Sequence, residues 1–184
     1  MRTVQRSEIV DYQTYEETSG IFRMEVLGAK SRRRVTLGDY FTFLFENPLT
    51  IRYQVQEMMR AEKIVREKDI SHELETYNNL LGGVGELGAT LLIEIDDPEV
   101  RDSKLREWFS LPEHIYVLME DGAKVHAVFD PSQRGRDRLS SVQYLKFPVK
   151  GRAPVALGVD HPAIRVETEL TADQRAALAE DLAL

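Results

Sequence analysis

The sequence has no cysteine among its 184 residues. Disulfides, thiolate nucleophiles, thiolate zinc sites and cysteine-ligated iron–sulfur clusters are therefore excluded within this chain. It also lacks an apolar run long enough to span a bilayer. The first residues, Met1 to Arg6, lead into no apolar segment of the kind found in signal peptides. We therefore expect a cytoplasmic protein that does not enter a membrane.

An excess of positive charge is also missing. The chain has 24 Lys and Arg against 31 Asp and Glu, which gives a formal net charge of −7. This balance favours solubility and argues against a general role in binding nucleic acids. The hydrophobic fraction of 42% and the charged fraction of 30% are ordinary for a globular protein. The length suits a single domain over residues 1–184.

Helix signals are dense between residues 36 and 82. Thr36 and Asp39 resemble a capping box, and the apolar residues after them favour a short buried helix. Asn47 is a good N-cap, and Pro48 fits the first position of a second helix. Three helices are predicted, over residues 37–46, 48–67 and 69–81, with Gly82-Gly83 ending the last. Residues 1–35 show no clear pattern and are expected to be irregular.

From residue 87 the apolar period becomes that of a strand, and residues 87–170 are expected to be mainly β. Asp121-Gly122 separates two β-rich runs and predicts a tight hairpin. A two-residue turn there would place Val117 opposite His126. One face of this hairpin would then be apolar and pack against the helices: Tyr116, Leu118, Val125 and Ala127.

The chain ends with a further helix signal. Thr171 and Gln174 form a capping box before a run rich in alanine and leucine, which predicts a helix over 171–183. Runs of helices followed by runs of strands are typical of an α+β fold with a mostly antiparallel sheet. We expect a kinked helix and a helical hairpin packed on that sheet, followed by the C-terminal helix.

One carboxylate stands out within the second predicted helix. Its apolar stripe contains Ile51, Val55, Met58, Met59 and Val65. Glu62 falls in the middle of this stripe, so it must find a partner, become protonated or reach a wet cavity. We expect Glu62 to be mostly buried. A structural ion pair explains it most simply. The functional alternative is a ligand-binding pocket formed by Glu62, Arg60, Tyr53 and Glu57.

Other candidate motifs are weaker. The segment Gly83 to Gly88 matches GxGxxG, but a helix precedes it and a strand follows, which reverses the context of a dinucleotide site. It is expected to be a turn, and no cofactor is implied. Asp69 and His72 have the spacing of metal ligands, but an N-capping Asp and an exposed His explain them better, so no metal site is predicted.

Basic residues gather in two runs. Arg134, Arg136 and Arg138 crowd one loop, and residues 30–34 form another basic segment. Together they could form an anion-binding site, but a solvated loop is the simpler interpretation.

Several segments together resemble a bacterial family known as domain of unknown function 3501. They are Phe43 to Asn47, Gln54 to Met58, Tyr77-Asn78, Ala89 to Glu94 and Ser141 to Phe147. The resemblance covers roughly residues 5–170. It carries no established activity or catalytic residues. The resemblance also implies a gene neighbourhood, because genes of the family often look like neighbours of genes for rubrerythrin and iron–sulfur oxidoreductases. This implies a redox or peroxide-stress setting by association.

The function predicted from the sequence is that of an accessory or interaction protein. No complete catalytic constellation is present, and the resemblance implies a redox protein as partner. The alternative is a small-ligand or anion-binding domain, or an enzyme, with a pocket around Glu62. A pocket joining its predicted residues would favour the second hypothesis, and an exposed apolar patch would favour the first.

Overall fold

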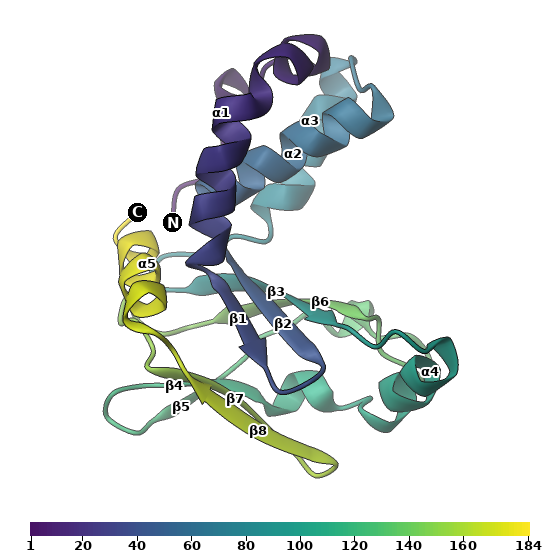
Figure 1. The fold of residues 1–184 in the computed structure, drawn as a ribbon, viewed down its shortest axis with the longest axis vertical. Coiled ribbons are helices and arrows are strands. Elements are labelled where there is room, and N and C mark those ends of the chain that lie inside the picture. Colours follow the sequence, from purple (N-terminus) through teal and green to yellow (C-terminus); the bar gives the residue numbers. More distant parts are fainter.

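The computed structural model describes all of residues 1–184 and has an α+β fold (Figure 1). Three helices form a head above two antiparallel sheets, and the last helix lies where the head meets the sheets. The helices are α1 (Tyr12–Ser31), α2 (Pro48–Glu62), α3 (Glu67–Asn78), α4 (Pro98–Glu107) and α5 (Ala172–Leu182). The strands are β1 (Arg34–Leu37), β2 (Phe41–Glu46), β3 (Leu87–Ile93), β4 (Ile115–Leu118), β5 (Lys124–His126), β6 (Val142–Phe147), β7 (Ala156–His161) and β8 (Ile164–Glu169).

The segment expected to be irregular contains the longest helix, so that prediction is wrong. The carboxylate of Asp11 accepts hydrogen bonds from the backbone N–H groups of Gln13 and Thr14 and starts α1. Only Tyr15, Ser19 and Val26 of α1 are buried. Its outward face also carries apolar residues, which hides the helical period in the sequence. No helix in the protein is both long and apolar enough to cross a membrane.

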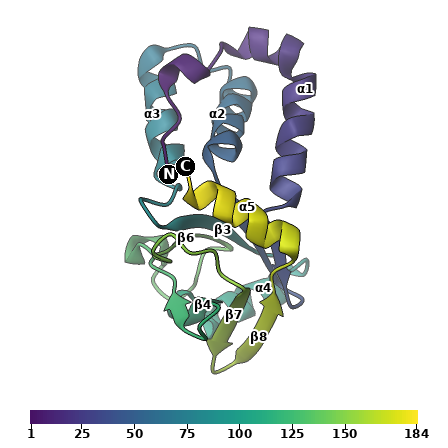
Figure 2. The same cartoon turned by 90° about the vertical axis from the view of Figure 1, so that its left-hand side faces the viewer.

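The next two helices follow the sequence more closely. Asn47 caps α2 and Pro48 opens it, as predicted. The helix ends earlier than expected, at Glu62, because Lys63 adopts a left-handed conformation with φ of 52°. Figure 2 shows α3, α2 and α1 side by side. Their core is small and is completed by the N-terminal segment: Val4, Ile9, Ile51, Val55, Met59, Ile70, Leu74 and Leu81.

The predicted helix over residues 37–46 does not exist. The chain forms β1, a turn and β2 instead. Phe41, Phe43 and Phe45 recur every second residue, and all three are buried on one face of the strand. Density of apolar residues suggested a helix, but their period of two matches a strand and fills the core between the sheets.

Two four-stranded sheets share the larger core. Sheet A has the order β1-β2-β3-β6, and sheet B has the order β5-β4-β7-β8, with every pairing antiparallel. Residues from both inner faces meet, such as Phe43 and Leu91 from sheet A with Val117 and Leu157 from sheet B. Trp108, which follows α4, and Leu178 of α5 complete this core. The mostly antiparallel α+β class predicted from the sequence is confirmed.

The β4–β5 hairpin exists, but its register differs from the prediction by one residue. Tyr116 pairs with His126 and Val117 with Val125. The loop is longer than two residues, since the N–H of Met119 donates to the carbonyl of Ala123, with Gly122 at φ of 81°. This one-residue shift reverses the face of β4 that was expected to be buried, whereas Val125 and Ala127 face the core as predicted. Val117 therefore points into the core, whereas Lys124 and His126 are exposed beside Tyr116.

Strand β7 lies in a segment, residues 150–161, whose glycine and proline content is typical of a loop. Gly158 lies within it and pairs with Tyr116 of β4. A Cβ atom at Gly158 would collide with the Tyr116 ring. The Tyr116 ring lies directly on the backbone at this position, so only glycine fits there, although glycine is usually unfavourable inside a strand.

The Gly-rich connection joins α3 to β3, as the reversed motif predicted. Gly82 and Gly88 are both buried, and each has a backbone carbonyl where its Cβ would lie. At Gly88 this oxygen belongs to Leu80. The glycines therefore allow the end of the helical segment to rest directly on the start of β3.

A buried ion pair joins the head to the sheets. Arg33 follows α1, and its guanidinium donates two hydrogen bonds to the carboxylate of Asp181 in α5, at 2.7 and 2.8 Å. The two side chains are 5% and 2% exposed. Asn47, the N-cap of α2, donates a further bond to Asp181 through its side-chain amide. Arg33 also donates to the carbonyl of Ala29.

We predict that Arg33→Ala destabilises the protein by about 3–5 kcal/mol, because it leaves the Asp181 carboxylate buried without its cation. Chemical denaturation measures the free energy of unfolding. The neighbouring exposed pair Arg32–Glu180 supplies the control, and Arg32→Ala is expected to change stability little. Equal effects of both substitutions would show that the buried pair has no special role.

The glycines give a second test. Gly88→Ala should lower the free energy of unfolding by about 1–3 kcal/mol, since the new methyl group overlaps the Leu80 carbonyl. The control is Gly28→Ala in α1, where no atom lies near the added Cβ. That change should raise stability by about 0.5–1 kcal/mol, the usual gain on replacing a helical glycine. A neutral Gly88→Ala would contradict the close contact.

Candidate functional site

The least expected polar group in the protein is the carboxylate of Glu46. It is the last residue of β2 and is only 7% exposed. It accepts hydrogen bonds from the hydroxyls of Thr50 at 2.6 Å and Thr90 at 2.8 Å. Neither partner is charged, and no cation contacts this carboxylate, which is unusual for a buried acid.

The electrostatics of this region follow from burial. Burial raises the pKa of Glu46 above its ordinary range, while the two threonine hydroxyls and the nearby charge of Lys30 oppose the shift. Burial also lowers the pKa of Lys30, which lies near the end of α1. The Lys30 ammonium forms no ion pair and lies 4.6 Å from the centroid of the Tyr53 ring. An acid and a base that do not contact each other are both shifted toward their neutral forms.

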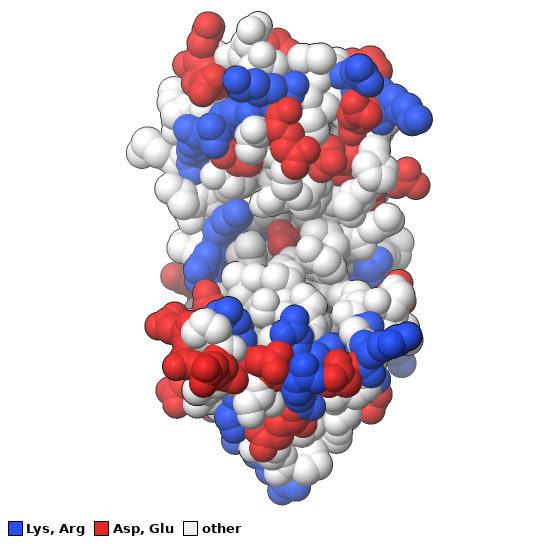
Figure 3. Space-filling model, turned by 90° about the vertical axis from the view of Figure 1, so that its right-hand side faces the viewer, with Lys and Arg blue, Asp and Glu red and all other residues white.

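A layer of half-buried side chains surrounds this pair. The outer face of sheet A carries Leu44, Thr90, Leu92 and Val142, all partly exposed and outside both hydrophobic cores. Tyr144, on the same face, is 41% exposed. Figure 3 shows a pale band across the middle of the molecule between charged surfaces, with one acidic group near its centre. The head therefore leaves part of the outer face of sheet A uncovered, and we call this surface, together with Glu46, Lys30 and Tyr53 at its edge, the waist groove.

The sequence contained a signal for this site that the helix prediction obscured. Read as a strand, residues 41–46 place Glu46 opposite the phenylalanine face, beside Thr42 and Leu44. The capping box of α2 then brings Thr50 back to Glu46. Burial of the acid depends on how the head packs on the sheet, which the local pattern does not reveal.

The predicted site around Glu62 looks different in the structure. Glu62 is exposed, so the expectation that it is buried is wrong. It lies at the end of α2, where the helix stops before Val65 could continue its stripe. It borders a shallow hollow shared with Lys63, Arg66 and His72. That Glu62, Arg60, Tyr53 and Glu57 together bind a ligand stays a prediction.

Glu57 instead has the partners expected of Glu62. It accepts a hydrogen bond from the Tyr15 hydroxyl at 2.7 Å and pairs with Arg23 and Arg60. Burial raises its pKa, but the bonds from Tyr15, Arg60 and Arg23 outweigh that effect and leave the pKa lowered. This network ties α1 to α2. Tyr53 lies apart from it, in contact with Phe22 and Lys30.

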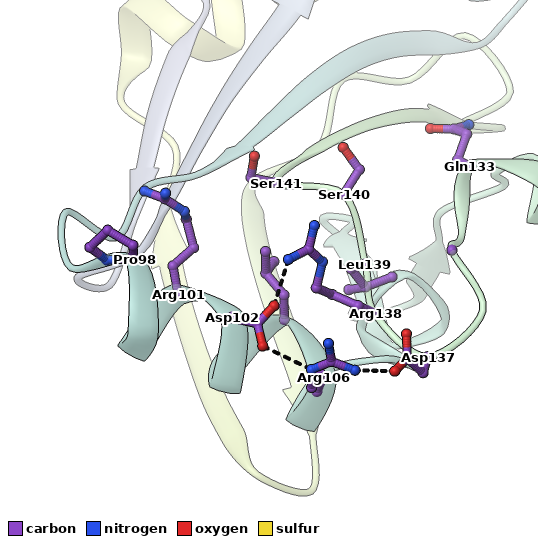
Figure 4. Close-up of a pocket in the computed structure, with 12 residues that line it drawn as sticks. Pro98, Arg101, Asp102, Arg106, Gln133, Asp137, Arg138, Leu139, Ser140 and Ser141 are labelled. Carbon is purple, nitrogen blue, oxygen red and sulfur yellow. Dashed lines mark hydrogen bonds and ion pairs between the residues drawn. The ribbon is translucent and has the colours of Figure 1, made fainter.

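The largest cavity lies beside α4, with a volume of about 860 Å³ (Figure 4). It is lined by Arg101, Arg106 and Arg138 together with Asp102 and Asp137. Figure 4 shows a chain of ion pairs in which Asp102 joins Arg138 to Arg106, and Arg106 joins Asp137. Arg101 donates to the carbonyl of Ile95. The two carboxylates neutralise most of the arginine charge, so this arrangement fastens the loop to α4 and leaves little net attraction for an anion.

The three arginines of the predicted anion site separate in the structure. Only Arg138 lines the cavity of Figure 4. Arg134 pairs with Glu113 and lies over the rings of Phe109 and Phe129. Arg136 is exposed. Anion binding by the three together stays a prediction, although their positions give it no shared cavity.

A serine and a histidine approach each other near the end of sheet B. His161 Nε2 lies 3.1 Å from the hydroxyl of Ser110. The backbone N–H of Ala163 donates to His161 Nδ1, so the proton lies on Nε2 and points at the serine. A histidine in this tautomer cannot accept the proton of Ser110, and the pair does not resemble an activated nucleophile.

We predict that Glu46→Gln changes how stability depends on pH. An acid whose pKa is raised by folding destabilises the folded state once pH exceeds its ordinary value near 4.5. The glutamine side chain keeps partners for both threonines without a charge. The variant should therefore melt higher than wild type at pH 8, with the difference shrinking below pH 4.5. Thermal unfolding across this pH range tests it, and a variant that is less stable at pH 8 would contradict it.

Comparisons with known proteins agree with this fold. The family model described as "Protein of unknown function (DUF3501)" matches residues 3–182. The chain is also similar to a novel protein of unknown function from Burkholderia pseudomallei K96243, known from its crystal structure. Their sequences are 30% identical, the TM-score is 0.88, and the match covers 98% of this chain and 99% of the other. No curated protein matches. The chain belongs to DUF3501, a family of proteins of unknown function.

Proposed function

We propose that the protein is a cytoplasmic accessory protein that docks on a partner protein through the outward face of α1. This face carries three exposed apolar side chains, Ile21, Met24 and Leu27, which are 85%, 74% and 66% exposed. Their spacing of three residues places them on one side of the helix. A row of large exposed apolar residues on a helix is typical of a surface that another protein covers.

Two glycines add to this proposal. Gly20 and Gly28 lie on the same outward face as Met24, one turn or so to either side of it. A Cβ at either position would meet no other atom, so packing within the chain does not require glycine there. Glycine costs stability in a helix interior. Small residues beside large apolar ones let another helix approach closely, which supports a helical docking element in the partner.

The position of α1 in the head also suits docking. Helix α2 lies between α1 and α3, so α1 forms one edge of the head (Figure 2). Its inner side is fixed to α2 through the Glu57 network. The outer face can therefore be covered without disturbing the fold. The resemblance found in the sequence suggests a redox or peroxide-stress protein as the class of partner.

The interface can be tested with Met24→Glu. The substitution places a charge on an exposed apolar face and should leave thermal unfolding unchanged, because the side chain has little internal packing. In quantitative affinity purification from the native host, we expect the wild type to retain a specific partner that the variant loses. Val65→Glu is the control, because Val65 is 68% exposed but lies after α2.

Identical sets of bound proteins for wild type, Met24→Glu and Val65→Glu would refute the interface. Sedimentation of the purified protein tests the alternative that a second copy of the chain covers this face. A dimer that Met24→Glu dissociates would identify a second copy of the chain, instead of a different protein, as the partner.

A further inference from the structure

We propose that the waist groove binds a small organic carboxylate that also carries an amino or hydroxyl group on an apolar body. The groove lies between the inner side of the head and the outer face of sheet A. It is separate from the outward face of α1, and the proposal does not depend on the docking function.

The cation for the carboxylate is Lys30. Its ammonium has no carboxylate partner and no hydrogen bond within the chain, and it lies over the Tyr53 ring. A half-buried ammonium without a partner is costly, and most lysines avoid the cost by reaching solvent. An anionic group that enters the groove would supply the missing partner. The aromatic ring holds the ammonium in place beforehand, which lowers the entropic cost of binding.

The acceptor for the amino or hydroxyl group is Glu46. The hydroxyls of Thr50 and Thr90 each bond to a different oxygen of this carboxylate and fix its orientation. Each carboxylate oxygen accepts more than one hydrogen bond, so both can still receive a donor. Lys30 lies over the ring of Tyr53, and Glu46 is bonded to Thr50, which is one turn earlier on the same face of α2. Helix α2 therefore places the cation and the acceptor near each other, and no ion pair joins them.

The surface around the pair suits an apolar or aromatic body. Leu44, Leu92 and Val142 lie on the outer face of sheet A and belong to neither core. Tyr144 stands beside them and pairs across the sheet with Thr90, whose hydroxyl bonds Glu46. A cavity of about 580 Å³ begins at Tyr144 and continues past Leu80 and Phe129. This cavity shares Tyr144 with the groove and adds apolar surface, Leu80 and Phe129, at that end.

Three probes with a shared phenyl body separate the two polar contacts. L-Phenylalanine has both charged groups, 3-phenylpropionate has the carboxylate alone, and 2-phenylethylamine has the ammonium alone. Nuclear magnetic resonance titration of the labelled full-length protein should show saturable shifts at Leu44, Thr90 and Tyr144. We expect affinity to fall in the order given. No shifts are expected at Ile21, Met24 or Leu27.

Substitutions assign each contact. Lys30→Met should weaken the binding of both carboxylate probes, L-phenylalanine and 3-phenylpropionate, by about tenfold or more. This is the usual effect of losing a charge-assisted hydrogen bond. Glu46→Gln should weaken the binding of phenylalanine but leave that of 3-phenylpropionate unchanged. Lys68→Met is the control, because Lys68 is an exposed lysine in the first turn of α3, away from sheet A, and the change should leave all affinities unchanged. The same spectra show whether each variant is folded.

Two results would overturn the proposal. One is the absence of saturable shifts in the groove with either carboxylate. The other is binding that survives Lys30→Met. If Glu46→Gln spares phenylalanine, the assignment of Glu46 as the acceptor is wrong. None of these outcomes affects the α1 interface, which Met24→Glu tests separately.

Discussion

The structure depends on the buried ion pair between Arg33 and Asp181. These residues are 148 positions apart in the chain, and their contact brings the end of α1, the start of α2 and the C-terminal helix to one point. Removing two charges from water is costly, and the bonds from Asn47 and to Ala29 offset part of that cost. Any other placement of the head on the sheets would leave a buried charge without its partner, so the pair favours the placement seen here.

That fixed placement explains why the protein has two hydrophobic cores. The larger core fills the space between the two sheets, and the smaller one fills the head. Since the ion pair and α5 join the two bodies at one side, the head need not pack flat against sheet A. The outer face of this sheet therefore keeps half-buried apolar residues and a buried acid. The waist groove is a consequence of joining the two bodies at an edge.

The two proposed functional surfaces lie on adjacent sides of α1. Lys30, three residues after Leu27, lies over Tyr53 of α2, whereas Ile21, Met24 and Leu27 are exposed on the outward side. The arginine cavity beside α4 has more volume, but its charges already pair with each other. Groups left without partners distinguish a candidate site better than volume does, because an unsatisfied charge gains the most free energy from a ligand.

The sequence by itself determined the features that depend on neighbours within a few residues. The Asn47–Pro48 helix start, the alternation of β3 and the capping box at Thr171 were all correctly predicted, as was the α+β class. The period of two in residues 41–46 already indicated a strand, although the density of apolar residues obscured it. Only the tertiary structure decided that α1 is a helix and which face of β4 is buried. It also decided that Glu46, rather than Glu62, is the glutamate that is buried without a cation beside it. Helix caps and the spacing of apolar residues depend on neighbours in the sequence. The burial of a charge and the register of two strands depend on segments far apart in the chain, which meet only after folding.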